Sequence, residues 1–154
     1  ALDVGRSLRR AGLSIATAES CTGGLIAKCL TDIAGSSDYF ERGWVTYSNA
    51  AKRTELGVPA RLLERHGAVS EETALAMARG ALRKSSARVS IAVTGIAGPA
   101  GGTPDKPVGT VWIAWGLKRP DETQVFARLF RFRGSRNAVR RQAAAAALEG
   151  LPAS

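Results

Sequence analysis

The chain has 154 residues, of which 45% are hydrophobic and 23% charged, so it is long enough for one domain with a substantial core. No apolar run approaches the roughly 18 residues that would span a membrane, and no charged-then-apolar signal segment opens the sequence. We therefore expect residues 1–154 to form a single domain without a membrane partner. The sequence starts at Ala1 and not at a methionine, which suggests a trimmed chain or a domain cut from a longer one.

The net charge is +9, and most of the positive charge is arginine. Such an excess favours anionic partners, namely phosphates, nucleic acid or acidic lipid. A solvated basic face explains the same charge equally well. Nothing resembles a helix-turn-helix, an aromatic RNA-stacking motif or a zinc finger, so nucleic-acid binding is a minor hypothesis. Six of the arginines fall late in the chain, at Arg128, Arg131, Arg133, Arg136, Arg140 and Arg141.

The two cysteines, Cys21 and Cys29, do not form a disulfide framework. If both lie on one helix, their spacing of eight residues separates them by about 12 Å, whereas a disulfide allows roughly 7 Å between Cα atoms. Free thiols are typical of a reducing cytoplasm, where we expect the protein to be located. The single histidine, His66, argues against a His/Cys metal cage.

The first half of the sequence alternates between helical and extended patterns. Residues 3–12 have the spacing of a short amphipathic helix, and a strand is expected near residues 13–18. The glycines that follow this strand open a second helix. This second helix is expected over residues 22–34. We expect the elements after it to be a strand over 42–48, two helical pieces within 49–67 broken at "GVP", and a helix over 71–85 capped by Ser70.

The second half begins with "RVSIAVTG", a nearly continuous apolar run that is typical of a strand covered on both faces. The segment "IAGPAGGTPDKP" is too rich in Gly and Pro to be anything but a loop. Two further strands, "VGTVWIAWG" and "TQVFARLFRFR", are joined by a hairpin-length connection. A helix in "SRNAVRRQAAAAALEGL", with Ser135 as its N-cap, closes the chain.

Strands that alternate with helices and then form a hairpin predict an α/β fold. We expect three layers, α/β/α, around a mixed five-stranded sheet in the order 2-1-3-4-5, with the fourth strand antiparallel. In such sheets ligands bind beyond the carboxyl ends of the parallel strands. Three loops would meet there, at residues 18–24, 48–53 and 94–102.

The stretch "TAESCTGG", residues 17–24, joins the first strand to the next helix and carries both Ser20 and Cys21. Backbone amides beside Gly23 and Gly24 could hold a developing oxyanion, and glycine lets a ligand approach closely. The alternative is an ordinary tight turn in which Thr22 caps the helix. A P-loop, G-x-G-x-x-G, S-x-x-K and G-x-S-x-G are all absent from the sequence.

A serine hydroxyl attacks a carbonyl only if a base removes its proton. His66 sits at the end of a helical piece, where capping of carbonyls is the favoured role. Lys52, in "TYSNAAK", is the better base, because burial can lower a lysine pKa from about 10.4 towards 7 or 8. Serine–lysine pairs are an established variant of the catalytic triad. Cys21 is a rival nucleophile, since a helix N-terminus activates a thiolate, and the pattern alone does not decide between the two.

Five segments together closely resemble the CinA C-terminal domain family, from about Gly5 to Leu151 and in the family's order. They are "TAESCTGG", "DIAGSSDYFERGWVTYSNAAK", "HGAVSEETA", "TGIAGPAGGTPDKPVGTVW" and "FRGSRNAVRRQAAAAAL". The resemblance implies a CinA-like, anticodon-binding-domain-like fold. It also implies deamidation of nicotinamide mononucleotide to nicotinate mononucleotide and ammonia, without metal or cofactor, by a homodimer.

Carried over to this sequence, the resemblance implies that Ser20 is the nucleophile and Lys52 its base, with Tyr47 relaying or orienting a proton. It settles the contest between the two nucleophiles against Cys21. One departure stands out: Ser135 occupies a position where the family usually has Asp, which puts in doubt a salt bridge to Arg136. The residues implied to contact substrate are Thr22, Gly23, Gly24, Asn49, Thr94, Gly95, Gly98, Arg136 and Arg140.

The same resemblance supports a second function, because the module is often fused behind another domain in this family. The alternative is a non-catalytic nucleotide-binding or accessory domain of a CinA-like, competence-associated protein. Tight binding of nicotinamide mononucleotide without turnover would distinguish it from the amidase.

Overall fold

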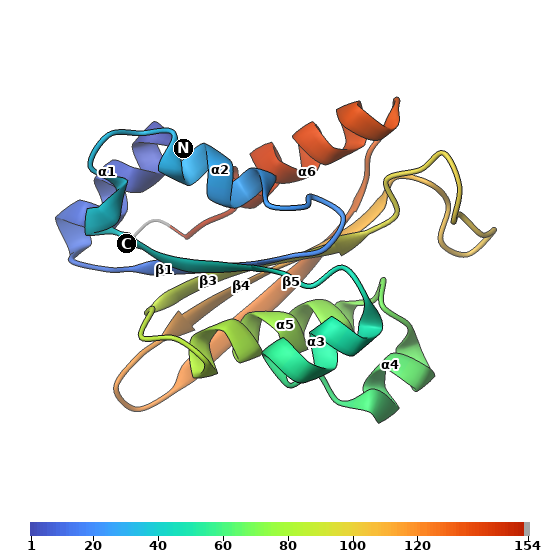
Figure 1. Ribbon diagram of the computed structural model, residues 1–154, viewed down its shortest axis with the longest axis horizontal. Coiled ribbons are helices and arrows are strands. Elements are labelled where there is room, and N and C mark those ends of the chain that lie inside the picture. The colour runs from blue at the N-terminus through green and yellow to red at the C-terminus, as the bar shows by residue number, and fades with distance from the viewer. Residues whose placement is uncertain (153–154) are drawn as a thin grey trace.

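The computed structural model describes residues 1–152, which pack as three layers around one mixed β-sheet (Figure 1). Helices α1, α2 and α6 cover one face of the sheet, and α3, α4 and α5 cover the other (Figure 1). The elements are α1 (Leu2–Ala11), β1 (Ile15–Glu19), α2 (Leu25–Thr31), the short 3₁₀ helix η1 (Ser36–Asp38), β2 (Phe40–Val45), α3 (Asn49–Leu56), α4 (Ala60–His66), α5 (Glu71–Arg83), β3 (Val89–Gly95), β4 (Thr110–Lys118), β5 (Thr123–Arg131) and α6 (Arg136–Glu149).

The sheet has the order β2-β1-β3-β4-β5, which confirms the predicted order and the predicted α/β class. Strand β1 pairs in parallel with both β2 and β3, whereas β4 is antiparallel to β3 and to β5. The carboxyl ends of β1, β2 and β3 therefore share one edge of the sheet, where the predicted ligand-binding loops begin.

Two hydrophobic clusters form the core, one on each face of the sheet. Ile15 and Ile26 belong to the cluster beneath α2 and α6, while Ala16, Ala18 and Leu56 belong to the one beneath α3 and α5. This alternation along β1 shows how consecutive side chains of a strand supply opposite layers. Strand β3 is buried along almost its whole length, as expected for a strand at the centre of a covered sheet.

Several predicted boundaries were wrong by a few residues. Helix α2 covers Leu25–Thr31 and not 22–34, because two glycines with positive φ delay its start and a turn at Gly35 follows its end. Strand β2 spans Phe40–Val45 and not 42–48. The chain leaves that strand early because the Ser48 side chain accepts a hydrogen bond from the Ala51 amide and caps α3.

The predicted caps of the later helices are confirmed. The Ser70 side chain accepts from the Thr73 amide at the start of α5, and the Ser135 side chain accepts from the Ala138 amide at the start of α6. Position 135 thus has a structural function as serine, since it ends the β5–α6 connection and orients the first turn of α6.

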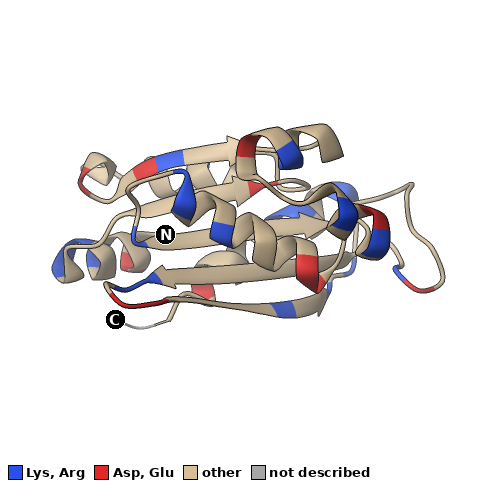
Figure 2. Ribbon diagram, turned by 90° about the horizontal axis from the view of Figure 1, so that it is seen from below, with Lys and Arg blue, Asp and Glu red and all other residues tan. Residues whose placement is uncertain are grey.

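The basic residues are spread over the surface. In Figure 2 lysine and arginine positions are interspersed with acidic ones along the helices and strands. Late arginines also have partners within the fold, since Arg128 lies over the rings of Trp115 and Phe130 and Arg131 donates to the Thr110 hydroxyl. Within residues 1–152, no helix is both long and apolar enough to cross a membrane.

Candidate active site

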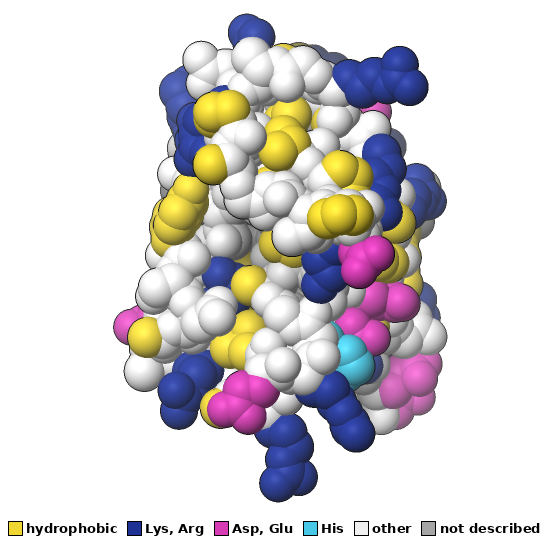
Figure 3. Space-filling view, turned by 90° about the vertical axis from the view of Figure 1, so that its right-hand side faces the viewer, with side chains coloured by type: hydrophobic (Ala, Val, Ile, Leu, Met, Phe, Trp, Pro, Cys, Tyr) yellow, Lys and Arg dark blue, Asp and Glu magenta, His cyan; other side chains and the backbone are white. Residues whose placement is uncertain are grey.

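The carboxyl edge of the parallel strands brings together the loops that carry the predicted site residues. Figure 3 views the molecule from this side, where lysine and arginine side chains lie among uncharged and hydrophobic groups and acidic side chains gather along the right-hand flank. A separate cavity of about 510 Å³ lies between α1 and the end of α6 and is lined by none of the predicted site residues. The site is therefore defined by its side-chain geometry and not by the size of a cavity.

Ser20 and Lys52 are in direct contact at this edge. Ser20 follows the last residue of β1, and Lys52 is the fourth residue of α3. The Lys52 Nζ lies 3.1 Å from the Ser20 Oγ, and it also donates to the carbonyls of Thr46 at 2.8 Å and Tyr47 at 3.2 Å. This distance lies within the range that proton transfer between a base and a nucleophile requires.

The Lys52 amine is held where its charge is poorly solvated. The residue is only 1% exposed, and burial lowers the pKa of Lys52 below its usual 10.5 because desolvation penalises the charged form. Within residues 1–152, no carboxylate forms an ion pair with this amine. A neutral lysine is the form that can take a proton from a hydroxyl.

Cys21 points away from this pair. Its side chain packs in the cluster beneath α2 and α6, whereas Ser20 contacts Lys52 of α3 on the opposite side of the sheet. Burial raises the pKa of the Cys21 thiol to about 11, so the thiolate that would be nucleophilic is disfavoured at neutral pH. The geometry thus separates the two residues that the sequence pattern left as rivals.

Glu19 fixes the turn that follows the serine. This carboxylate is buried, and its two oxygens accept from the amides of Ile26 at 2.9 Å and Ala27 at 3.0 Å. It therefore satisfies amides in the first turn of α2, where a negative charge is favourable. The alternative in which Thr22 caps this helix was wrong, since the N-cap is Gly24 and no side-chain cap is formed there.

Arg140 holds the same turn from α6. Its Nε donates to the Cys21 carbonyl at 3.0 Å and its Nη2 lies 3.3 Å from the Thr22 carbonyl. In a trans peptide the N–H points opposite to the carbonyl, so the Arg140 contact with Cys21 directs the Thr22 amide away from the guanidinium. The structure thus places Arg140 on the backbone of the turn that follows the serine.

The amides of this turn are unequally available. The Gly23 amide donates to the Ser20 carbonyl at 3.0 Å, and the Ser20 amide donates to the Val93 carbonyl. Both amides are therefore already hydrogen-bonded within the protein. Within residues 1–152, the amides of Cys21, Thr22 and Gly24 have no backbone acceptor. Gly24 has a φ of 98°, a conformation that favours glycine.

A second arginine joins two of the loops across the site. The Arg136 guanidinium donates to the Gly98 carbonyl at 2.7 Å and to the Tyr47 hydroxyl at 2.9 Å. Tyr47 is 59% exposed, so its ring lies on the rim while its own carbonyl contacts Lys52. Arg136 therefore has Gly98 and Tyr47 as partners, whereas the family usually has Asp at position 135.

The remaining predicted residues lie around this arrangement. Thr94 is buried and donates to the Ala68 carbonyl at 2.8 Å, which ties β3 to the segment before α5. At Gly95 an added Cβ would lie 2.7 Å from a methyl group of Val111, so packing on β4 requires glycine there. Asn49 is the exposed first residue of α3, directly after the cap.

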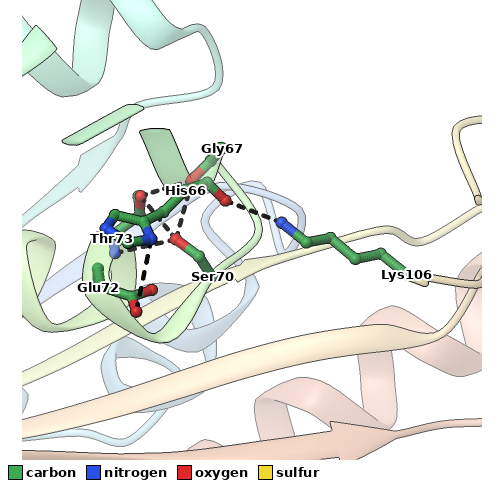
Figure 4. Close-up of polar contacts among 6 residues, drawn as sticks. All are labelled: His66, Gly67, Ser70, Glu72, Thr73 and Lys106. Atoms are coloured by element: carbon green, nitrogen blue, oxygen red, sulfur yellow. Dashed lines mark hydrogen bonds and ion pairs between the residues drawn. The ribbon is translucent and has the colours of Figure 1, made fainter. Parts of the chain in front are cut away.

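His66 occupies a different polar cluster (Figure 4). Its Nδ1 lies 3.6 Å from a carboxylate oxygen of Glu72, and its carbonyl accepts from Lys106 Nζ at 2.9 Å. The prediction that the imidazole caps the helix carbonyls was wrong, because Lys106 binds the His66 carbonyl and the Gly67 amide donates to Leu63. Within residues 1–152, no group of three His, Cys, Asp or Glu residues could hold a metal ion.

Two residues of this site were not singled out from the sequence. Glu19 was assigned no role, although a carboxylate that ends a buried strand shortly before a helix is a signal for stabilisation of the helix start. Thr46 gave no signal, because only the fold shows that its carbonyl accepts from Lys52.

A three-layer α/β/α domain with a buried serine–lysine pair at the carboxyl edge of its sheet defines the class of this protein. The CinA C-terminal domain family matches residues 1–154. The chain belongs to this family, as the resemblance of its motifs implied.

Over the aligned residues, curated relatives are more than 50% identical to this chain. It is 55% identical to a nicotinamide-nucleotide amidohydrolase PncC of Pseudomonas putida, over 96% of this chain and 90% of that protein. The PncC of Escherichia coli K12 is 52% identical, over 96% of this chain and 88% of that protein. A CinA-like protein of Akkermansia muciniphila is 54% identical over 94% of this chain, which spans only 34% of that longer protein.

Solved structures share the fold. A competence/damage inducible protein from Agrobacterium tumefaciens superposes with a TM-score of 0.89 at 47% identity, over 96% of this chain and 90% of that one. A CinA superfamily protein from Escherichia coli gives a TM-score of 0.90 at 39% identity, over 96% of this chain and 83% of that one.

Proposed function

We propose that this protein is an amidohydrolase that converts nicotinamide mononucleotide to nicotinate mononucleotide and ammonia through an acyl-enzyme on Ser20. The observation that carries the proposal is the 3.1 Å contact between the Ser20 Oγ and the buried Lys52 Nζ. The names of the Pseudomonas and Escherichia relatives, nicotinamide-nucleotide amidohydrolase, support the substrate class. The proposal places the enzyme in pyridine nucleotide salvage.

In the acylation step the neutral Lys52 amine takes the Ser20 proton, and the oxygen attacks the carboxamide carbon. The pyridinium ring withdraws electrons from this carbonyl and so favours the attack. The carbon–nitrogen bond then breaks, the Lys52 ammonium returns its proton to the leaving nitrogen, and ammonia departs. The remaining acyl group is an ester on Ser20.

In the deacylation step a water molecule gives one proton to Lys52 and attacks the ester carbonyl. The carbon–oxygen bond to Ser20 breaks, the serine oxygen recovers a proton from Lys52, and the acid is released. The oxyanion of each tetrahedral intermediate would be stabilised by amides of the turn. The Thr22 and Gly24 amides suit this role, because the Gly23 amide is already bonded to the Ser20 carbonyl.

The substrate's phosphate suits the exposed Arg136 on the rim. A guanidinium carries five N–H donors, and two of its nitrogens bond to Gly98 and Tyr47, so donors remain for a phosphate. In this proposal Tyr47 orients Arg136 and the ring of the substrate, and Asn49, Thr94, Gly95 and Gly98 shape the pocket wall. Arg140 contributes to the site by holding the turn whose amides face the substrate.

The test is ammonia release from nicotinamide mononucleotide by the wild-type protein and by Ser20→Ala. We expect turnover by the wild type and a loss of at least about 1,000-fold in the variant, since the nucleophile is removed. Thr17→Val, a substitution on the opposite face of β1, is the matched control and should retain activity. Equal rates for wild type and Ser20→Ala would refute the proposal.

A non-catalytic accessory domain is the second candidate, because this chain spans only 34% of the CinA-like relative from Akkermansia. It predicts saturable binding of nicotinamide mononucleotide by calorimetry with no ammonia released over hours.

The protein is also proposed to be a homodimer. Size-exclusion chromatography with light scattering tests this oligomeric state. Cell fractionation tests the proposed cytoplasmic location.

A further inference from the structure

Three buried threonine hydroxyls, those of Thr17, Thr22 and Thr46, have no hydrogen-bond partner within residues 1–152. A buried hydroxyl without a partner costs free energy, so each one calls for an explanation. Thr46 is only 1% exposed and has no role in the proposed function so far.

The strand register places Thr46 beside Ser20. Glu19 of β1 pairs with Val45 of β2, and the Thr46 amide donates to the Glu19 carbonyl at 2.9 Å. The parallel pairing of β1 with β2 therefore continues for one more residue on each chain segment, which places Thr46 opposite Ser20. Partners in a parallel ladder carry their side chains on the same face.

The alternation of side chains along β2 gives the face on which Thr46 lies. Trp44 packs against the cluster beneath α3 and α5, and Val45 lies towards α2, with a methyl group 3.6 Å from where a Cβ of Gly24 would be. Thr46 follows in the alternation and so faces the side of Trp44. This is also the face on which Ser20 contacts Lys52.

Lys52 connects the two residues directly. Its Nζ donates to the Thr46 carbonyl at 2.8 Å and lies 3.1 Å from the Ser20 Oγ. In the proposed reaction the leaving nitrogen must come within reach of this amine to receive its proton, and the entering water must come within reach to lose one. Both groups thus occupy one position, beside Lys52 and on the face that carries the Thr46 hydroxyl.

We infer that the Thr46 hydroxyl is the acceptor that orients the leaving nitrogen and then the hydrolytic water. This inference rests on the proposed function. In acylation, an N–H of the departing carboxamide nitrogen donates to Thr46 Oγ1, which directs the nitrogen's lone pair towards the Lys52 ammonium. In deacylation, one O–H of water donates to Lys52 and the other to Thr46 Oγ1, which directs the oxygen lone pair towards the ester carbon.

Thr17 supplies an internal control for this role. Its hydroxyl is equally buried and also has no partner within residues 1–152, but it lies on the α2 side, where a Cβ added at Gly43 would come within 2.6 Å of it. Replacing either threonine with valine removes one buried hydroxyl and keeps the branched shape. An effect specific to the reaction must therefore appear at Thr46 and not at Thr17.

The experiment compares kcat and KM for nicotinamide mononucleotide in wild type, Thr46→Val, Thr46→Ala, Thr46→Ser and Thr17→Val, with melting temperatures for all five proteins. We expect both Thr46→Val and Thr46→Ala to lower kcat about 10- to 100-fold, the range for one lost hydrogen bond, with KM within about threefold of wild type. Thr46→Ser keeps the hydroxyl and should recover most of the rate. Thr17→Val should turn over like the wild type.

The outcomes separate this inference from the function on which it rests. An inactive wild type would remove the proposed function and the inference with it. An active wild type with unchanged kcat in Thr46→Val and Thr46→Ala would overturn the inference alone. A loss of kcat that Thr46→Ser does not restore, or that Thr17→Val shares, would also overturn it, because the effect would then come from packing.

Discussion

Ser20 and Cys21 are consecutive in sequence but lie on opposite sides of the central sheet. Ser20 accepts a hydrogen bond from Lys52 of α3, whereas Cys21 is buried in the cluster beneath α2 and α6. The period of two along an extended chain causes this separation, and it continues one step past the end of β1. Position alone therefore gives the hydroxyl access to the base and denies it to the thiol.

Replacing Cys21 with alanine should leave most of the activity. The thiol is buried and its pKa is raised to about 11 by that burial, so it contributes packing and no reactive thiolate. We expect kcat/KM within about threefold of wild type and a loss of stability of about 1 kcal/mol, from the smaller side chain. Ammonia release and a denaturant titration measure the two effects. Near-total inactivation of a folded Cys21→Ala protein would restore the thiol as the nucleophile.

The rate should increase with pH through the pKa of Lys52. Only the neutral amine accepts the serine proton, and burial places this pKa below the usual 10.5, so kcat/KM should rise and reach a plateau below that pH. Lys52→Arg keeps the positive charge at every accessible pH and should be inactive throughout. A pH–rate profile that stays flat from pH 6 to 10 would contradict the role of Lys52 as base.

The same pKa shift predicts how stability depends on pH. Between the lowered pKa of the folded protein and the ordinary pKa of the unfolded chain, the unfolded state binds more protons at Lys52. Lys52 therefore makes the free energy of unfolding rise with pH across that window. Urea titrations of wild type and Lys52→Met at a series of pH values isolate this contribution. We expect the wild type to gain stability relative to the variant as pH rises.

Arg140 should affect turnover more than binding, because it contacts the carbonyls of Cys21 and Thr22 behind the turn. Hydrogen bonds to charged groups contribute about 1.5–3 kcal/mol when well shielded, and this half-buried arginine is partly screened by solvent. We expect Arg140→Ala to lower kcat at least about tenfold while KM changes less. Steady-state kinetics test this, with the exposed neighbour Arg141→Ala as the control. A variant that raises KM alone would assign Arg140 to the substrate.

Adding a single methyl group at Gly80 should lower both the stability and the activity of the protein. A Cβ at Gly80 of α5 would lie 2.1 Å from the Leu56 carbonyl oxygen, and Leu56 ends α3, the helix that carries Lys52. Arg83 of α5 also donates to that carbonyl, at 2.9 Å, so the two helices are fixed at this contact. We expect Gly80→Ala to cost about 1–3 kcal/mol of stability and to lower kcat by displacing Lys52. Arg79→Ala, on the exposed side of α5, should change neither quantity.

Residue patterns predicted the fold well because they report local conformation and burial. The apolar run of β3, the serine caps of α5 and α6 and the hairpin of β4 and β5 all follow from neighbouring residues. The predicted start of α2 was wrong by three residues, because it does not depend on adjacent residues alone. It depends on a carboxylate, Glu19, that reaches amides seven and eight residues later in the sequence.

The site was predictable in part. The motif pointed to Ser20, and Lys52 was favoured over His66 as its base, but their contact spans 32 residues and exists only in the folded protein. The contacts of Arg140 with the turn span about 120 residues, and no periodic pattern reports such a pairing. The hydroxyl of Thr46 was invisible for the same reason, since its position depends on the register between β1 and β2.

The central claim is that Ser20 carries the acyl group during turnover. Rapid acid quench of the wild-type protein with nicotinamide mononucleotide, followed by intact-mass and peptide analysis, tests it most directly. The account predicts a transient adduct with the mass of the nicotinate mononucleotide acyl group, on the peptide that contains Ser20, and none in Ser20→Ala. An adduct on any other residue, or turnover by Ser20→Ala, would contradict it.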